Sequence, residues 1–382
     1  MTSTTVPRPR AGVLGALALA ADTADEIVLG TVRDVHGAVA TRVHTLIGRR
    51  SGTGPVSSAV YAGIGCGLRA TSRGLRAADR RFGARIEESP AGRVLVSAVN
   101  GFIGDRLAED GSDLAITMAV RVRHRDVAPD RASLAEAFPS ATGDVVVFLH
   151  GLAEPDTAWD RQADERGGRY GDRLAEQGWT AVYLRANTGL PIAENGVALA
   201  ALLDDLVAAW PTPVRRIALV GHSMGGLVMR AACAVTTDAD ERWTDLVTDV
   251  VTLGTPHLGA PLERGVALGA RALGLLPESA PFGRILEYRS VGILDLRGGL
   301  ARDVQNLPNA RYHLVAATLA ASHRHPVSET LGDGLVRFAS ATGRPRRGPD
   351  MFPAADLLHI RGGHFDLLNH PEVEDALRAW LA

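Results

Sequence analysis

The chain has 382 residues and a nearly balanced charge, with 41 basic and 43 acidic side chains that give a formal net charge of −2. It contains no lysine, so every basic residue is an arginine. This composition excludes enzymes that form a Schiff base through lysine, and it excludes P-loop NTPases, whose lysine binds phosphate. The balanced charge also gives no reason to expect nucleic acid as a partner.

Hydrophobic residues make up 46% of the chain and charged residues 22%, as in soluble globular domains. The length exceeds the roughly 250 residues of one compact core, which predicts either one large domain with an extension or two domains. Cys66 and Cys233 are too few for a disulfide scaffold or a structural zinc site. The spacing His323-Arg324-His325 is metal-like but lacks a third ligand nearby, so we expect no metal and no cofactor.

The first twenty residues have two interpretations. Arg8 and Arg10 precede the apolar run 11–20, whose end, Ala18-Leu19-Ala20, is similar to a signal-peptidase site. The run also fits the first turns of a helix, because it is short, rich in alanine and interrupted by Gly15. We expect a cytoplasmic protein, with secretion as the alternative. No stretch reaches the roughly 20 apolar residues that span a bilayer, so no transmembrane segment is expected.

Residues 1–110 are predicted to form a helical extension. Within 28–46, apolar side chains recur at spacings of three and four, which is typical of a helix with one buried face. Residues 49–85 contain eight arginines and a single acidic residue, Asp79. Such a basic amphipathic segment could make a peripheral contact with an anionic lipid or polymer surface. The alternative, which we favour, is a solvated helix face whose apolar stripe packs on the next domain.

The pattern changes after residue 113. Leu114–Val122 alternates like a strand with one exposed face. Short apolar runs follow, the first four separated by helical stretches: Val145–Leu149, Thr180–Leu184, Arg216–Val220, Val247–Leu253 and Tyr312–Ala317. This alternation predicts an α/β fold with a mostly parallel sheet covered by helices on both faces. In such sheets the chemistry gathers at the carboxyl ends of the strands.

One strand end carries a nucleophile pattern. Arg216–Val220 leads directly into Gly221-His222-Ser223-Met224-Gly225-Gly226, which is G-x-S-x-G between a strand and a helix. The glycines avoid clashes in a tight turn, and the turn places the Ser223 hydroxyl at the amino end of a helix, where N–H groups favour developing negative charge. The pattern predicts Ser223 as a nucleophile. The alternative is a glycine-rich turn that happens to contain a serine.

A serine nucleophile needs a base, and the base needs an acid that orients it. When the serine lies on such a turn, the acid and then the histidine follow it along the chain. We predict His364 as the base, because it follows a strand and a glycine loop near the C-terminus, with His370 in reserve. His359 lies inside the expected strand, where a hydrogen-bonded structural role is expected.

Asp333 is the predicted acid, because its flanking glycines allow a loop to turn the carboxylate inward. An ordinary Asp-Gly surface turn is the alternative interpretation of this segment. The next candidates for the acid are Asp295 and Asp303.

The negative charge that develops during attack needs two N–H donors. We predict the backbone N–H of Met224, directly after the nucleophile, and that of Leu152, in the loop after Val145–Leu149. His150 begins this loop, and we expect it to order the loop by hydrogen bonding rather than to act as a base.

Together these motifs resemble α/β-hydrolases of the bacterial lipase type, close to the GPI inositol-deacylase-like esterases. The resemblance covers about residues 113–382. The matching segments, in family order, are Phe148-Leu149-His150-Gly151-Leu152, Gly221-His222-Ser223-Met224-Gly225-Gly226, Leu253-Gly254-Thr255-Pro256-His257-Leu258-Gly259, Gly332-Asp333-Gly334-Leu335-Val336 and Gly363-His364-Phe365. The resemblance implies an α/β-hydrolase catalytic domain over 111–382. It also implies a triad of Ser223, Asp333 and His364, with oxyanion donors at Leu152 and Met224. For His257 it implies a structural role.

The resemblance further implies a serine carboxylic-ester hydrolase that acts on a small-molecule or lipid ester through an acyl-enzyme. The segment 259–309 resembles the small helical cap that shapes the acyl pocket in lipases, with plain helical packing as the alternative. The same residues would also serve a thioesterase, an amidase, a polyester depolymerase or an acyltransferase. A non-catalytic surface-binding protein with a hydrolase fold is the alternative outside enzymes.

Overall fold

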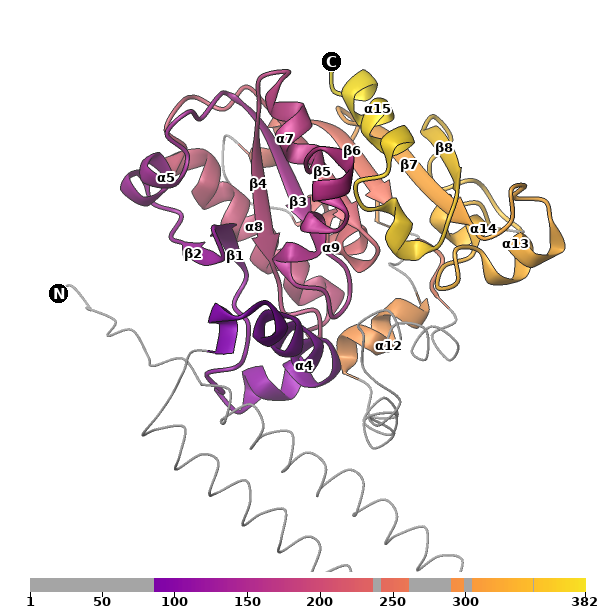
Figure 1. Cartoon of the computed structure of the whole chain (residues 1–382), viewed down its shortest axis with the longest axis horizontal. Coiled ribbons are helices and arrows are strands. Elements are labelled where there is room, and N and C mark those ends of the chain that lie inside the picture. The colour runs from indigo at the N-terminus through magenta and orange to yellow at the C-terminus, as the bar shows by residue number, and fades with distance from the viewer. Residues whose placement is uncertain (1–85, 236–241, 261–289, 299–303, 346) are drawn as a thin grey trace, which may run out of the picture. The chain divides into compact units, whose positions relative to one another are not determined.

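The computed structural model describes residues 86–235, 242–260, 290–298, 304–345 and 347–382 (Figure 1). The predicted N-terminal helices before residue 86, the arginine-rich segment 49–85 and most of the predicted cap 259–309 lie outside the described residues. The chain divides into two compact units, one comprising the described parts of 97–110, 115–272 and 290–382. The described residues of the other unit are 86–96 and 111–114. The domain boundary near residue 110 stays a prediction.

The larger unit is built on one eight-stranded sheet (Figure 1). Its strand order is β2-β1-β4-β3-β5-β6-β7-β8; β1 runs antiparallel to both of its neighbours, and the strands from β4 to β8 are parallel. This mostly parallel sheet with flanking helices confirms the predicted fold class. The strands are β1 (Ala119–Val122), β2 (Arg125–Val127), β3 (Asp144–Leu149), β4 (Trp179–Arg185), β5 (Arg216–His222), β6 (Val247–Leu253), β7 (Arg311–Thr318) and β8 (Asp356–Arg361).

The central strands are buried on both faces because helices cover both. Along β3, Val145 and Val147 belong to one hydrophobic cluster with α8 (Ile192–Ala209) and α9 (Met224–Cys233). Val146 and Phe148 belong to a second cluster with α7 (Tyr170–Ala175) and α15 (Pro371–Trp380). Successive side chains of a strand point to opposite faces, so a continuous apolar run fits this double burial.

The remaining helices are mostly short. Within the described ranges, none of the helices combines the length and the apolar character needed to cross a membrane. The longest of them, α4, has a kink at Ile103, whose backbone angles are not helical. These elements are η2 (Ile86–Glu88), α4 (Pro90–Glu109), α5 (Arg131–Ala137), η3 (Asp156–Asp160), α6 (Ala163–Arg166), η4 (Trp243–Leu246), α12 (Val291–Gly298), α13 (Pro326–Leu331), α14 (Phe338–Ala341) and η6 (His364–Leu367).

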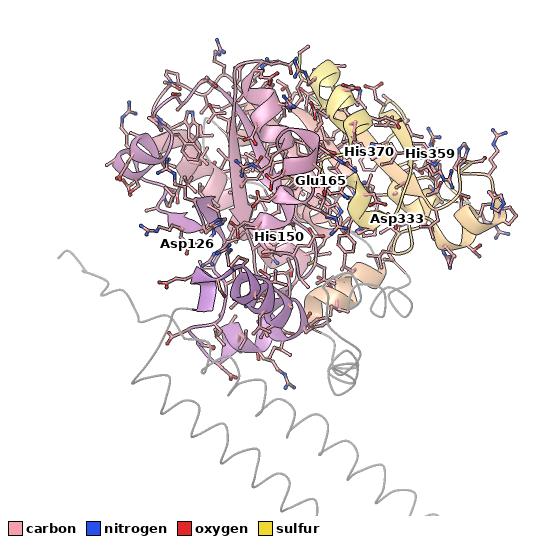
Figure 2. All side chains as sticks on the ribbon, in the orientation of Figure 1. Asp126, His150, Glu165, Asp333, His359 and His370 are labelled. Atoms are coloured by element: carbon pink, nitrogen blue, oxygen red, sulfur yellow. The ribbon has the colours of Figure 1, made fainter. Side chains whose placement is uncertain are left out.

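The first predicted strand differs from the structure. The expected strand Leu114–Val122 is present only as the four residues of β1, and a β-hairpin to β2 follows it. The turn consists of Arg123 and His124, both with positive φ (48° and 64°), which glycine or asparagine would adopt more readily. Arg121 holds the hairpin, since its Nη1 lies 2.6 Å from Asp126 Oδ1 and its Nη2 donates to the carbonyl of His124. Figure 2 labels Asp126 on this hairpin.

Candidate active site

Ser223 occupies the sharp turn between β5 and α9. Its backbone has φ 51° and ψ −122°, a conformation that L-residues rarely adopt. Strain of this kind costs of order 1–3 kcal/mol and persists only where surrounding contacts hold it. One such contact is the hydrogen bond from Ser223 N to Leu253 O at the end of β6, at 2.8 Å. The strained turn is where the sequence pattern predicted it.

The glycines of this turn are required by close backbone packing. A Cβ on Gly221 would lie 2.6 Å from Gly226 Cα, and a Cβ on Gly225 would lie 2.6 Å from His150 O. Contacts this short are not tolerated by side chains. The turn therefore brings the start of α9 against the end of β3, where the predicted oxyanion loop begins.

Asp333 and His364 form a buried pair at the ends of two loops. Asp333 Oδ2 lies 2.7 Å from His364 Nδ1, and the two side chains are 1% and 3% exposed. Asp333 Oδ1 accepts hydrogen bonds from the N–H groups of Leu335 (2.9 Å) and Val336 (2.8 Å). The backbone also joins the pair, because His364 N donates to Asp333 O at 3.0 Å. The carboxylate is thus fixed from one side and directed at the imidazole from the other.

The electrostatic environment of His364 favours its protonated form. Burial alone would lower its pKa, but the charge and hydrogen bond of Asp333, with a further contribution from Glu154, raise the pKa above the ordinary value of 6.5. A histidine with a raised pKa is a stronger base once it is neutral. This is what a group that removes a proton from a serine requires.

Ser223 and His364 lie close together, although no hydrogen bond joins these two described residues. A Cβ on Gly254 would lie 3.1 Å from His364 Cε1, and Gly254 directly follows Leu253, whose carbonyl accepts from Ser223 N. Contacts between nucleophile and base are often long without substrate and tighten on binding. The structure thus brings the three predicted triad residues to one edge of the sheet and joins two of them directly.

The loop after β3 approaches the serine closely. A Cβ on Gly151 would lie 2.9 Å from Ser223 Cβ. The N–H of Leu152 has no hydrogen-bond acceptor among the described residues. Met224 is the first residue of α9, so its N–H has no partner within the helix. Both predicted oxyanion donors are therefore available beside Ser223.

Two further polar side chains at the site were not predicted from the sequence. Glu154 and His222 are buried, and His222 Nδ1 lies 2.9 Å from Glu154 Oε1. His222 precedes Ser223 at the end of an apolar strand, where a buried histidine needs a partner, so its position was a usable signal. No local pattern marks Glu154, because its partner lies 68 residues away.

The other histidines and acids considered as candidates have structural contacts. His359 Nε2 lies 2.7 Å from Thr318 Oγ1, as expected for a structural histidine in β8. His370 occupies the N-cap position of α15, and its backbone N–H donates to Tyr170 Oη at 2.7 Å. Figure 2 labels His359 on β8, and Asp333 and His370 on the loops next to β8 and α15.

His150 and Asp295 order neighbouring backbone. His150 Nδ1 lies 3.0 Å from Gly151 O, and the N–H of Ala186 donates to His150 Nε2 at 3.2 Å. Burial lowers the pKa of His150, as in a neutral imidazole that accepts a hydrogen bond. Asp295 Oδ2 accepts from the first N–H of α8 at 2.9 Å, a favourable place for a carboxylate. Asp303 lies outside the described residues.

His257 is also buried, just after the end of β6. Its Nε2 is 3.2 Å from Thr252 Oγ1, and burial lowers its pKa well below 6.5. Among the described residues, no group of three or more His, Cys, Asp or Glu side chains is placed to hold a metal ion.

The segment around the proposed nucleophile matches a known protein family. A family model described as the PGAP1-like alpha/beta domain matches residues 198–269, which span the end of α8, β5, the turn at Ser223 and β6. No curated protein matches the chain. The match covers less than half of the chain, and over that segment it agrees with the resemblance predicted from the sequence. The sheet order and the flanking helices agree with the predicted α/β-hydrolase fold.

Several solved structures are similar to the chain at low identity. Lipase BlEst2 of Bacillus licheniformis is 20% identical, with 69% of this chain and 97% of that chain covered and a TM-score of 0.41. Esterase Pf2001 of Pyrococcus furiosus is 18% identical, with 63% and 83% covered and a TM-score of 0.42. The NocB thioesterase domain of the nocardicin cluster is 18% identical, with 64% and 96% covered and a TM-score of 0.40.

Proposed function

We propose that the protein is a serine carboxylic-ester hydrolase that works through an acyl-enzyme. The observation that carries the proposal is the buried contact of 2.7 Å between Asp333 and His364 beside a serine held at φ 51°. A strained serine, a histidine with a raised pKa and a carboxylate that orients it are the parts that nucleophilic acyl transfer needs.

In the proposed mechanism Ser223 Oγ attacks the ester carbonyl while His364 Nε2 accepts its proton. Asp333 holds the imidazole with Nδ1 protonated and stabilises the imidazolium that forms. The N–H groups of Leu152 and Met224 bind the oxyanion, and each donor contributes about 2.7–4 kcal/mol to transition-state stabilisation. His364 then protonates the leaving alcohol, and water releases the acyl group by the same steps in reverse.

The nucleophile is tested by combining kinetics with covalent labelling. Wild-type protein should hydrolyse p-nitrophenyl esters and react with a fluorophosphonate probe, and Ser223→Ala should lose both. Ser133→Ala is a matched control, since Ser133 bonds Asp130 at the start of α5 and should leave both intact. Full turnover by Ser223→Ala, or labelling of that variant at the wild-type rate, contradicts the proposal.

The substrate class is tested by varying the acyl group and the leaving group separately. A series of esters with increasing acyl length reports the depth of the pocket. Matched thioesters, amides and polyesters, and an added acceptor alcohol, separate the proposed esterase from a thioesterase, an amidase, a depolymerase and an acyltransferase. A protein that binds ester surfaces without any turnover or labelling would instead be a non-catalytic binding protein.

A further inference from the structure

A second carboxylate–histidine pair lies beside the proposed triad, and the mechanism above gives it no part. Glu154 is 6% exposed and His222 is fully buried. His222 Nδ1 lies 2.9 Å from Glu154 Oε1 and 3.0 Å from Oε2. Burying a carboxylate and its polar partner is costly, and an apolar pair of similar volume often stabilises a protein as well. Stability alone therefore does not account for this pair.

The contacts of the pair hold the ring of His222 between two acceptor groups. Its Nε2 faces the carbonyl oxygen of His364 at 3.3 Å, and its Nδ1 faces the Glu154 carboxylate. The ring orientation of His222 is thereby tied both to the base loop and to Glu154. Burial would raise the pKa of Glu154, but the charge and hydrogen bonds of its neighbours, His222 first, lower it.

The same pair contacts all three parts of the proposed machinery. Glu154 Oε2 accepts from Gly151 N at 2.8 Å, and the next residue along the chain is the proposed oxyanion donor. His222 is the residue directly before Ser223. Its ring lies 4.8 Å from that of His364, centroid to centroid, and its Nε2 reaches the His364 carbonyl. The oxyanion loop, the nucleophile turn and the base loop meet at these two side chains.

We propose that Glu154 and His222 are positioning residues, a buried hydrogen-bonded pair that holds the oxyanion loop and the base loop in register with the serine. The proposal rests on the esterase function proposed above and assigns the pair no contact with substrate. An N–H donor stabilises the transition state only when it is aimed at the oxyanion, and a displacement of 1 Å costs about 100-fold in rate. The pair should therefore affect kcat much more than KM.

Another buried pair in the same sheet offers a matched control. Asp249 and His313 lie on β6 and β7, with Asp249 Oδ1 2.9 Å from His313 Nε2, and both are buried. Asp249 is near the amino end of β6, four residues before Leu253, whose carbonyl bonds Ser223 N. Four strand residues span about 13 Å, so this pair lies away from the site. Asp249→Asn reproduces the loss of a buried carboxylate without touching the machinery.

The test compares Glu154→Gln with Asp249→Asn in the full-length protein. Glu154→Gln should lower kcat on a p-nitrophenyl ester by about 10- to 100-fold and leave KM unchanged. The affinity for phenylboronic acid, which forms a tetrahedral adduct with the serine, should fall by the same factor as kcat. Asp249→Asn should leave kcat, KM and boronate affinity at wild-type values, whatever its effect on the unfolding midpoint.

Further variants keep the test decisive if Glu154→Gln does not fold. Glu154→Asp retains the charge on a shorter side chain and should lose less kcat than Glu154→Gln. His222→Gln combined with Glu154→Gln should cost no more than the larger single loss, because the two residues act as a unit. Wild-type kcat in Glu154→Asp and Glu154→Gln, or an equal loss in Asp249→Asn, overturns the positioning role. A wild-type protein without esterase turnover overturns the proposed function itself, so the two failures are distinguishable.

Discussion

Replacing Asp333 by asparagine is the sharpest test of the proposed triad. Asp333 Oδ1 accepts from two backbone N–H groups, those of Leu335 and Val336, and Oδ2 faces His364 Nδ1. In Asp333→Asn the amide oxygen must take the Oδ1 position, because an NH₂ group there would face two donors. The NH₂ group is then forced toward His364 Nδ1.

This forced orientation determines the tautomer of the base. An NH₂ group donates, so His364 Nδ1 must accept and the ring proton moves to Nε2. An imidazole protonated at Nε2 cannot remove the proton of Ser223. In serine triads this error costs about 10⁴-fold in kcat, and we expect 10³- to 10⁴-fold, about 4–5.5 kcal/mol.

The assay is kcat/KM on a p-nitrophenyl ester, with the unfolding midpoint measured on the same samples. Asp249→Asn is again the control, since it removes a buried carboxylate that bonds His313 and lies near the amino end of β6. It should retain wild-type kcat/KM. If Asp333→Asn loses less than about tenfold while folded, the tautomer argument is wrong and another acid orients His364.

Four further predictions follow from the geometry of the site and its support. Because Asp333 raises the pKa of His364 above 6.5, kcat/KM should rise with pH along a limb centred above 6.5, and a limb below that value contradicts the assignment. The raised pKa of His364 also means that its contact with Asp333 stabilises the fold fully at a pH below the unfolded-state pKa of His364. This contribution is lost as the pH rises through the folded-state pKa, so Asp333→Asn should lower the unfolding midpoint more in mild acid than in base. Gly151→Ala puts a methyl group 2.9 Å from Ser223 Cβ and should displace the oxyanion loop, lowering kcat/KM by about 100-fold; unchanged kinetics would remove this loop from the mechanism. Asn369→Ala removes a buried side chain that bonds two carbonyls and one N–H, and it should lower the free energy of unfolding by about 2–4 kcal/mol in denaturant titrations, with kcat/KM unchanged.

The features that could be predicted from the sequence are those fixed by short-range rules. The runs that became β3, β4, β5, β6 and β7 are mostly apolar, because strands buried on both faces need no polar side. The tight turn at Gly221 and Gly225 could be predicted because such a turn leaves no space for a side chain at these positions. In both cases the constraint leaves a local mark on the chain, either a run of apolar residues or a glycine at a fixed position in the turn.

The hairpin and the second pair could not be predicted in this way. Arg123 and His124 form a two-residue turn with positive φ, which sequence patterns assign to glycine, asparagine or aspartate. Arg121 and Asp126 pair across the turn, and a contact of this kind leaves no turn signal in the sequence. Glu154 meets its partner only after the sheet has brought β3 beside β5, and no spacing in the chain encodes that approach.

Position along the strands is what separates the three buried carboxylate–histidine pairs found among the described residues. Asp333–His364, Glu154–His222 and Asp249–His313 have similar contacts of 2.7–2.9 Å and similar burial of their histidines. The first two lie at the carboxyl ends of parallel strands, beside a serine whose backbone is strained, whereas the third lies near the amino end of β6. The chemistry of a pair therefore does not identify a catalytic site by itself. What distinguishes a pair is its place relative to the proposed nucleophile and the proposed N–H donors. Asp249→Asn is therefore the appropriate reference for the variants of both other pairs.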